Sequence, residues 1–125
     1  MLPTIEEAKR ELETAGKLNP GPWVQHSLNV GRAARNIAEK VPALDSEKSY
    51  ILGILHDIGR RVGIVNIPKH VYEGYLYCSA KGWEEAAKIC MTHSYVRMQE
   101  EFDFEPSTVE EREIKKYIMN CKADD

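Results

Sequence analysis

The chain has 125 residues, of which 42% are hydrophobic and 30% are charged, and this length and composition fit one globular domain with a sizeable core. Its formal net charge of −3 offers no basic field to a nucleic-acid polymer or an anionic membrane, so neither is an expected partner. No apolar run approaches the roughly 20 residues that a bilayer requires, and the N-terminus lacks a signal-peptide core, so a cytoplasmic location is expected.

Helix signals dominate the N-terminal part of the chain. Thr4 and Glu7 form a capping box that starts a first helix, and Gly16 is expected to stop it. A second helix is expected over about 23–40, and a third begins at the cap Ser46. The predicted buried stripe of the first helix consists of Ile5, Ala8, Leu12 and Ala15.

The rest of the chain also has the period of amphipathic helices. The third helix is expected to stop at Gly59, and residues 60–66 are predicted to form a loop. A fourth helix is expected over about 66–80 and a fifth over about 83–91. The capping box and apolar face of a last helix comprise Ser107, Glu110, Ile114, Tyr117, Ile118 and Cys121. The predicted fold class is all-α, a single compact bundle of about six helices.

The three cysteines are too widely spaced for a structural zinc knuckle. They are Cys78, Cys90 and Cys121, and no C-x-x-C pair occurs. Cys90 and Cys121 fall on apolar helical faces, so we expect both to be buried, reduced thiols.

The pair His56-Asp57 lies inside an otherwise apolar helical segment. A core gains nothing from two such side chains, and burying them without partners costs on the order of several kcal/mol. A metal cation satisfies both, because imidazole and carboxylate are common ligands of first-row metals. The alternative is that Asp57 accepts a hydrogen bond at a helix end while His56 is half exposed.

The other three histidines are also predicted to point inward, each from a different helix. His93 follows Cys90 by one helical turn, and His70 has Gly74 one turn further on, where room is left beside the ring. His26 shares a predicted inward face with Val30, Ala33 and Ile37. A single such histidine is typical of a core residue bonded to a carbonyl. Four of them beside an aspartate favour a metal site built from facing helices.

This pattern resembles the HD superfamily of metal-dependent phosphohydrolases, above all its small stand-alone bacterial and archaeal members. The resemblance covers about residues 20–100 and rests on His26, on the run 56–59 (His-Asp-Ile-Gly), and on His70 and His93. The context 68–75 is similar to the third-histidine region of such proteins. The resemblance implies an all-α fold and hydrolysis of phosphomonoesters, phosphodiesters or nucleotides.

The resemblance also implies a set of metal ligands. His26, His56 and Asp57 would hold a first divalent ion, and His70 and His93 would hold a second, with Asp57 as a bridge. One or two ions of iron, manganese, zinc, nickel or magnesium are expected. In such a site a metal-activated water attacks phosphorus, and Asp57 orients this nucleophile.

Several basic and aromatic residues are candidates for substrate contacts. Arg60 is expected to hold a non-bridging phosphate oxygen, although Arg60 and Arg61 also fit an exposed surface pair. Lys69 is a weaker candidate of the same kind. Three tyrosines fit either a base or sugar pocket or simple packing, namely Tyr72, Tyr75 and Tyr77.

One departure from the family pattern bears on activity. Residues 1–125 are expected to be a single HD domain without the closing helix on which the family carries a further aspartate. Asp103, Asp124 and Asp125 lie downstream of His93 without a convincing helical context. Weak metal binding and feeble hydrolysis are therefore expected.

Two other functions remain open from the sequence. One is a catalytically degenerate HD-like module that binds a nucleotide or a protein partner, and the other is a helical bundle with core histidines and no metal. The expected partner of the enzyme is a small phosphorylated or nucleotide substrate, with a homodimer left open.

Overall fold

The computed structural model of the chain describes residues 1–64, 67–93 and 109–123, with the side chains of 111 and 118–123 excepted. Its α-helices are α1 (Ile5–Leu18), α2 (Pro22–Glu39), α3 (Ser46–Leu55), α4 (Ile67–Ala80), α5 (Glu84–Thr92) and α7 (Val109–Ala123), and a 3₁₀ helix, η1, covers Ile58–Val62. Within these ranges there is no strand, and no helix is both long and apolar enough to cross a membrane. The predicted all-α fold is confirmed.

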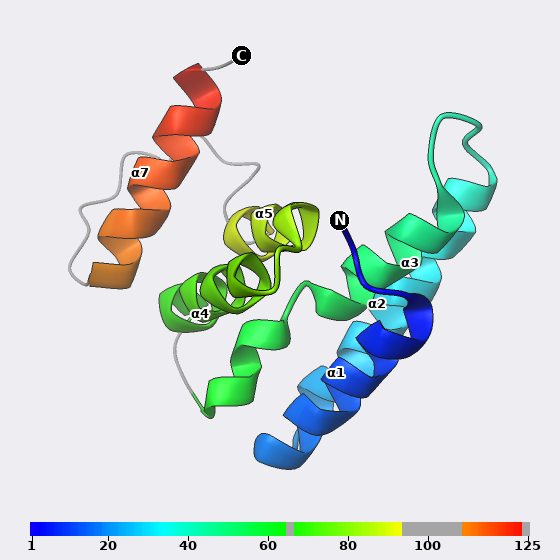
Figure 1. Ribbon diagram of the computed structural model, residues 1–125, viewed down its shortest axis with the longest axis horizontal. Helices are drawn as coiled ribbons and strands as arrows, with labels where there is room; N and C mark the ends of the chain where they lie inside the picture. Colours follow the sequence, from blue (N-terminus) through cyan, green and yellow to red (C-terminus); the bar gives the residue numbers. More distant parts are fainter. Residues whose placement is uncertain (65–66, 94–108, 124–125) are drawn as a thin grey trace.

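The helices form two groups that meet around η1 (Figure 1). In the first group α2 packs mainly on α3, and α1 covers α3 and η1. In the second group α4 packs on α5, η1 and α7. Because η1 follows α3 directly and contacts α4, the segment between α3 and η1 lies where the two groups meet.

The main core joins α1, α3, α4 and α5. Ala8, Leu12 and Ala15 of α1 are buried as predicted, against a cluster that includes Ile54 and Leu55. Each fully buried leucine or isoleucine side chain in this cluster contributes about 1.5–3 kcal/mol of transfer free energy. A smaller cluster links α4 and α5 to α7 through Val71, Met91 and Ile114.

The predicted helix boundaries agree with the structure to within a few residues. The Thr4–Glu7 capping box is present, but α1 continues past Gly16 to Leu18. A Cβ at Gly16 would lie 3.1 Å from a methyl group of Val24, so this glycine lets α2 approach closely rather than ending α1. The cap of α3 is Asp45, whose side chain accepts a hydrogen bond from the Lys48 amide at 3.0 Å; the predicted cap Ser46 is one residue too late.

The buried face of α2 is not the predicted one. Ala33 and Ile37 are exposed, and Ile37 retains 62% of its accessible surface, whereas Ser27, Gly31 and Ala38 are buried. A Cβ on Gly53 of α3 would lie 2.6 Å from the Gly31 Cα, so the two backbones nearly touch. The prediction was wrong because α3 accepts the small residues of α2, which permit this approach, rather than its apolar stripe.

The segment that carries the histidine–aspartate pair is not a continuous α-helix. α3 ends at Leu55, His56 is its C-cap, and the 3₁₀ turn that follows Asp57 replaces part of the predicted loop over 60–66. Gly59 allows η1 to lie directly on α4, because a Cβ there would overlap the His70 carbonyl and would lie 2.5 Å from the Gly74 nitrogen. The space that the sequence predicted beside Gly74 is filled by the Cys90 side chain of α5 and by η1, since a Cβ there would lie 3.0 Å from the Cys90 sulfur and 3.2 Å from the Gly59 nitrogen.

Candidate metal centre

The carboxylate of Asp57 is the meeting point of all four histidines. Its oxygen Oδ2 lies 3.3 Å from Nε2 of His56 and 4.0 Å from Nε2 of His26. Its other oxygen, Oδ1, lies 3.0 Å from Nε2 of His70 and 3.1 Å from Nε2 of His93. The side chain of Asp57 is only 7% exposed, so the histidines from α2, α4 and α5 close around a buried carboxylate.

His56 and His93 are oriented by the main chain of their own helices. His56 Nδ1 donates to the Gly53 carbonyl at 2.6 Å, and His93 Nδ1 donates to the Cys90 carbonyl at 2.9 Å. In the neutral ring this hydrogen bond fixes the tautomer and leaves an electron pair on Nε2, the atom that faces Asp57. Both rings are therefore held ready to bind a cation through Nε2.

The side of the carboxylate that faces α4 and α5 contains unsatisfied polar atoms. Asp57 Oδ1 is buried but accepts no well-aligned hydrogen bond from the described residues, despite two ring nitrogens within 3.1 Å. His70 Nδ1 is buried and likewise has no partner in the described part of the chain. His70 Nε2 and His93 Nε2 are 3.4 Å apart. A cation between Asp57 Oδ1 and the Nε2 atoms of His70 and His93 would satisfy the carboxylate oxygen, which as a buried polar atom needs a partner. It would not reach His70 Nδ1, which lies on the other side of the ring.

Two groups of donors in the described residues are compact enough to hold an ion. One consists of His26, His56 and Asp57, and the other of Asp57, His70 and His93; in each, the donor atoms lie within 4.8 Å of one another. Three protein donors per ion leave coordination positions for water or a substrate, as in catalytic zinc sites. Because Asp57 has two oxygens and belongs to both groups, it can bridge.

The histidines control the charge of Asp57. Burial alone would raise the pKa of this carboxyl, but the facing rings of His56, His70 and His93 hold its pKa far below the usual range. For His56, burial lowers the pKa, and the contact with Asp57 more than compensates, so its pKa lies above 6.5. Asp57 is therefore an anion under all ordinary conditions.

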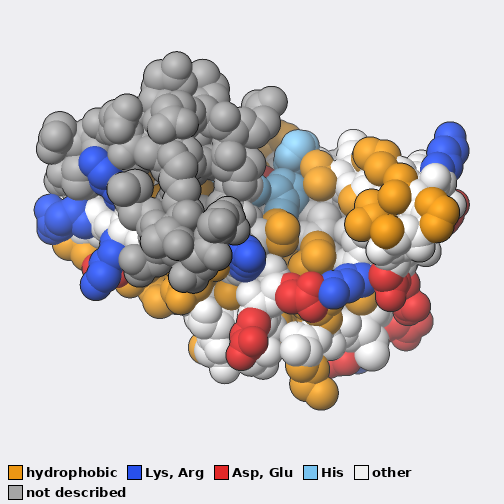
Figure 2. All heavy atoms as spheres, turned by 90° about the horizontal axis from the view of Figure 1, so that it is seen from above, with side chains coloured by type: hydrophobic (Ala, Val, Ile, Leu, Met, Phe, Trp, Pro, Cys, Tyr) orange, Lys and Arg blue, Asp and Glu red, His pale blue; other side chains and the backbone are white. Residues whose placement is uncertain are grey.

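His26 occupies an exposed position, contrary to the prediction that it points into the core. Its side chain is 58% exposed, although its ring lies 5.3 Å from the ring of His56. Figure 2 shows histidine side chains at the surface beside hydrophobic ones. The two donor groups therefore differ in solvent exposure, because the side chain of His26 is largely exposed whereas that of His70 is only 2% exposed.

Of the basic candidates, only Arg60 lies at the cluster. Its Nε is 3.6 Å from Asp57 Oδ2, and its side chain is 34% exposed. The guanidinium of Arg61 instead stacks over the ring of Tyr77, 4.2 Å from the ring centroid. Lys69 pairs with Glu73 and Glu110.

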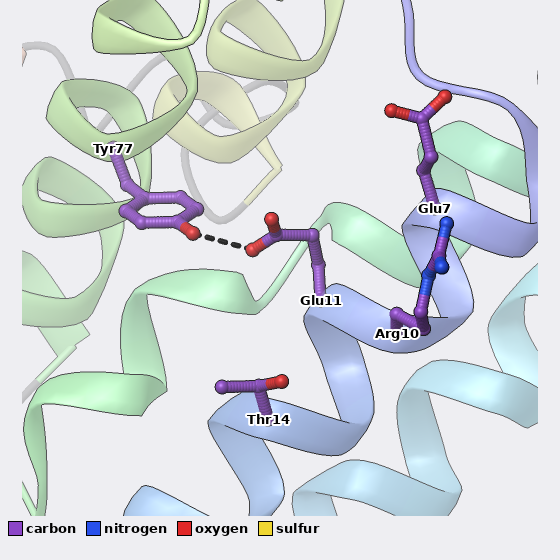
Figure 3. A pocket seen from close by; sticks show the side chains of 5 residues that line it. All are labelled: Glu7, Arg10, Glu11, Thr14 and Tyr77. Carbon is purple, nitrogen blue, oxygen red and sulfur yellow. Dashed lines mark hydrogen bonds between the residues drawn. The ribbon is translucent and has the colours of Figure 1, made fainter.

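The three neighbouring tyrosines do not line one pocket. Tyr72 stacks on Tyr75, and Tyr75 meets Tyr117 of α7 edge to face. Tyr77 points the other way and donates a short hydrogen bond to Glu11 of α1 (Figure 3). Tyr72 and Tyr75 line one cleft of about 170 Å³ and Tyr77 lines another of about 270 Å³, so the three do not form a single base pocket. Asp103, Ser107, Asp124 and Asp125 lie outside the described residues, as do the side chains of Ile118 and Cys121.

Sequence reasoning missed the residues that position the ligands. The carbonyls of Gly53 and Cys90 orient two rings, and the contact of Gly59 with α4 sets the distance from Asp57 to His70. The only signal in the sequence is the spacing of three residues between each carbonyl and its histidine. Cys90 is buried as predicted, and its thiol lies 3.9 Å from that of Cys78.

A comparison with protein families agrees with this geometry. The family model HD domain matches residues 23–119, a span that contains all four histidines and Asp57. The chain belongs to the HD domain family. Its members form the metal-dependent phosphohydrolase superfamily and bind divalent metals, and the two donor groups around Asp57 are able to hold such ions. No curated protein and no solved structure matches the chain.

Proposed function

We propose that this HD domain is a metal-dependent phosphohydrolase that acts on a phosphomonoester, a phosphodiester or a nucleotide. The observation that carries the proposal is the division of the four histidines between the two oxygens of one buried carboxylate. Packing of a hydrophobic core does not require histidines on both oxygens of a carboxylate, whereas two neighbouring cations bridged by that carboxylate require donors on both sides.

The residues fit two divalent ions. His26, His56 and Asp57 would hold one, and Asp57, His70 and His93 would hold the other. When bound, such ions supply a nucleophilic water at neutral pH and take up charge on the phosphoryl oxygens. The unsatisfied Asp57 Oδ1 and the His70–His93 contact support this fit.

Side chains of the protein provide the other functions of the proposed site. Asp57 stays anionic, so it orients donors on either side of it without taking up a proton. Arg60 directs one edge of its guanidinium toward Asp57 and is partly exposed, so its remaining donors are available to a non-bridging phosphate oxygen. The exposed ring of His26 marks the side from which a substrate enters.

A substrate screen tests the proposal. The protein, supplied with manganese or ferrous iron, is assayed against phosphomonoesters, phosphodiesters and nucleotides, together with Asp57→Asn and the exposed-site control Glu84→Gln. We expect metal-dependent release of phosphate or nucleoside that Asp57→Asn abolishes and Glu84→Gln retains. If the parent protein is folded by circular dichroism and is inactive against the whole panel, the hydrolase proposal is rejected.

The exposure of His26 favours one alternative, a module that binds a nucleotide without hydrolysing it. A donor that is 58% exposed and 4.0 Å from its nearest carboxylate oxygen holds an ion less firmly than the enclosed histidines do. Equilibrium binding of a nucleotide in the presence of manganese, with no turnover over hours, would select this alternative.

A further inference from the structure

A second cleft lies between α1, α2 and α3, built from residues outside the donor groups around Asp57. It has a volume of about 380 Å³, which lies within the range of about 300–1,000 Å³ found for small-molecule sites. Leu12 from α1, Val24 and Leu28 from α2 and Tyr50 from α3 form its apolar lining. The cleft therefore offers a surface for an apolar body of small-molecule size.

The lining contains a hydroxyl without a protein partner. Tyr50 as a whole is only 3% exposed, but its hydroxyl oxygen is not among the buried unpartnered atoms and forms no hydrogen bond with the described residues, so solvent reaches it. An accessible hydroxyl without a protein partner is free to donate a hydrogen bond to water or to a ligand. A ligand with an acceptor atom would pair with this hydroxyl.

The charges around the cleft are mainly positive. Lys9 and Arg32 line it, and Arg35 stacks on the Tyr50 ring with 4.4 Å between its guanidinium carbon and the ring centroid. None of the three forms an ion pair within the described part of the chain. The carboxylate of Glu13 also lines the cleft, but it already pairs with Lys17 at 3.6 Å.

We propose that this cleft binds a small anion with an apolar body, of the class of medium-chain carboxylates. The apolar part would lie on Leu12 and Leu28, and the carboxylate would pair with Lys9 and Arg32. The Tyr50 hydroxyl would donate to the same ligand. This site is separate from the proposed hydrolase and does not depend on it.

Calorimetric titration with decanoate, below the concentration at which it forms micelles, tests the proposal. Decanol serves as the uncharged analogue and decylammonium as the cationic one. We expect saturable binding of one decanoate per chain and binding of decanol about tenfold weaker, since a charged hydrogen bond is lost. Decylammonium should bind least. Equal affinities for decanol and decanoate, or no saturable binding of decanoate, would overturn the proposal.

Variants locate the site. The double variant Lys9→Gln, Arg32→Gln changes cations at the cleft, and Lys88→Gln changes an exposed cation on α5 as the control. We expect the double variant to weaken decanoate binding about tenfold and to leave decanol binding unchanged. Tyr50→Phe should also weaken decanoate while the protein stays folded. An unchanged affinity in the double variant would overturn the assignment. Asp57→Asn should bind decanoate with the affinity of the parent protein, so the test of this cleft is independent of the test of the hydrolase proposal.

Discussion

Asp57 divides its two oxygens between two pairs of histidines, so each pair can be tested separately. His93 belongs only to the group with His70, and its Nε2 lies 3.1 Å from Oδ1. We expect His93→Ala to lower the metal content of the loaded protein by about one ion per chain. Elemental analysis after dialysis measures this change. An unchanged stoichiometry would leave His93 as a core residue that is bonded to the Cys90 carbonyl.

The pKa of His56 predicts how metal binding depends on pH. Burial lowers this pKa, but the contact with Asp57 raises it above 6.5 overall, so the apo protein holds a proton on the ring more tightly than the unfolded chain does. That proton contributes to apo stability below about pH 6.5 and the contribution is lost as pH rises through the folded-state pKa. A metal must displace it, so metal affinity should rise with pH and binding should release protons.

Competition titrations between about pH 6 and pH 8, together with calorimetry in buffers of different ionisation enthalpy, measure both effects. An affinity that is independent of pH would contradict the assignment of His56 as a ligand.

Tyr77 provides a spectroscopic test of the contact between α1 and α4. Burial, followed by the hydrogen bond to Glu11, raises the pKa of Tyr77 to about 12. The folded state therefore binds this proton more tightly than the unfolded state, and the stabilisation is complete below pH 10 and is lost as pH rises through about 12. The ultraviolet titration of phenolate should lose its last step in Tyr77→Phe and shift it to lower pH in Glu11→Gln. No difference between Tyr77→Phe and the parent would contradict this.

At the residue scale the sequence predicted which side chains gather but not how each is held. The sequence predicted a single cluster because four histidines were expected to point inward from different helices beside one aspartate, and the resemblance to the HD superfamily implied the ligand set. The inward orientation of His26 was wrong, since hydrophobic periodicity records which helix face is apolar and not which face its neighbour can accept. The small residues Gly31 and Gly53 decided the orientation of α2.

At the scale of single elements, the capping box of α1 makes a measurable contribution. The Thr4 side chain accepts from the Glu7 amide at 3.1 Å, and the Thr4 amide donates to the Glu7 side chain at 3.2 Å. Thr4→Ala should lower the free energy of unfolding by about 1 kcal/mol. Urea denaturation measures this, with the exposed mid-helix variant Thr14→Ala as control, for which no loss is expected. Equal effects of the two variants would show that the cap contributes nothing.

The contact between η1 and α4 is less tolerant of change than the cap. In Gly59→Ala the new methyl group would meet the His70 carbonyl and the Gly74 nitrogen, and backbone atoms cannot rotate away. We expect a loss of about 1–3 kcal/mol in unfolding free energy, with weaker metal binding because His70 moves relative to Asp57. Gly21→Ala is the control, since its added carbon would make only an ordinary contact at 3.4 Å with Trp23. Unfolding free energies that match for both variants would contradict the close packing.

The existence of the helices was predictable from hydrophobic periodicity, and the start of α1 from its local capping box. The 3₁₀ turn of η1 was not, because it depends on the approach of α4 to Gly59, which no local pattern encodes. The same limitation explains why Gly16, a plausible helix stop, lies inside α1 against Val24.

At the scale of the whole molecule, the metal centre joins the two groups of helices. His26 and His56 belong to the α2–α3 pair, and His70 and His93 to the α4–α5 pair, so bound ions would cross-link them. A ligand present at a hundredfold excess over its Kd raises the unfolding free energy by about 2.7 kcal/mol. Thermal denaturation with manganese and with a chelator should therefore differ in midpoint, and Asp57→Asn should remove the difference. A midpoint shift that persists in Asp57→Asn would place the stabilising ion elsewhere.

The two main-chain carbonyls that orient His56 and His93 affect how the centre withstands mutation. In many metal proteins the orienting partner is a carboxylate, and a single substitution deletes it. Here the acceptors are the carbonyls of residues 53 and 90, and every amino acid supplies a carbonyl. Genetic drift at position 90 therefore alters packing but leaves the tautomer of His93 in place. Selection on ring orientation acts on the helix as a whole, and the imidazoles stay correctly turned for as long as their helices remain folded.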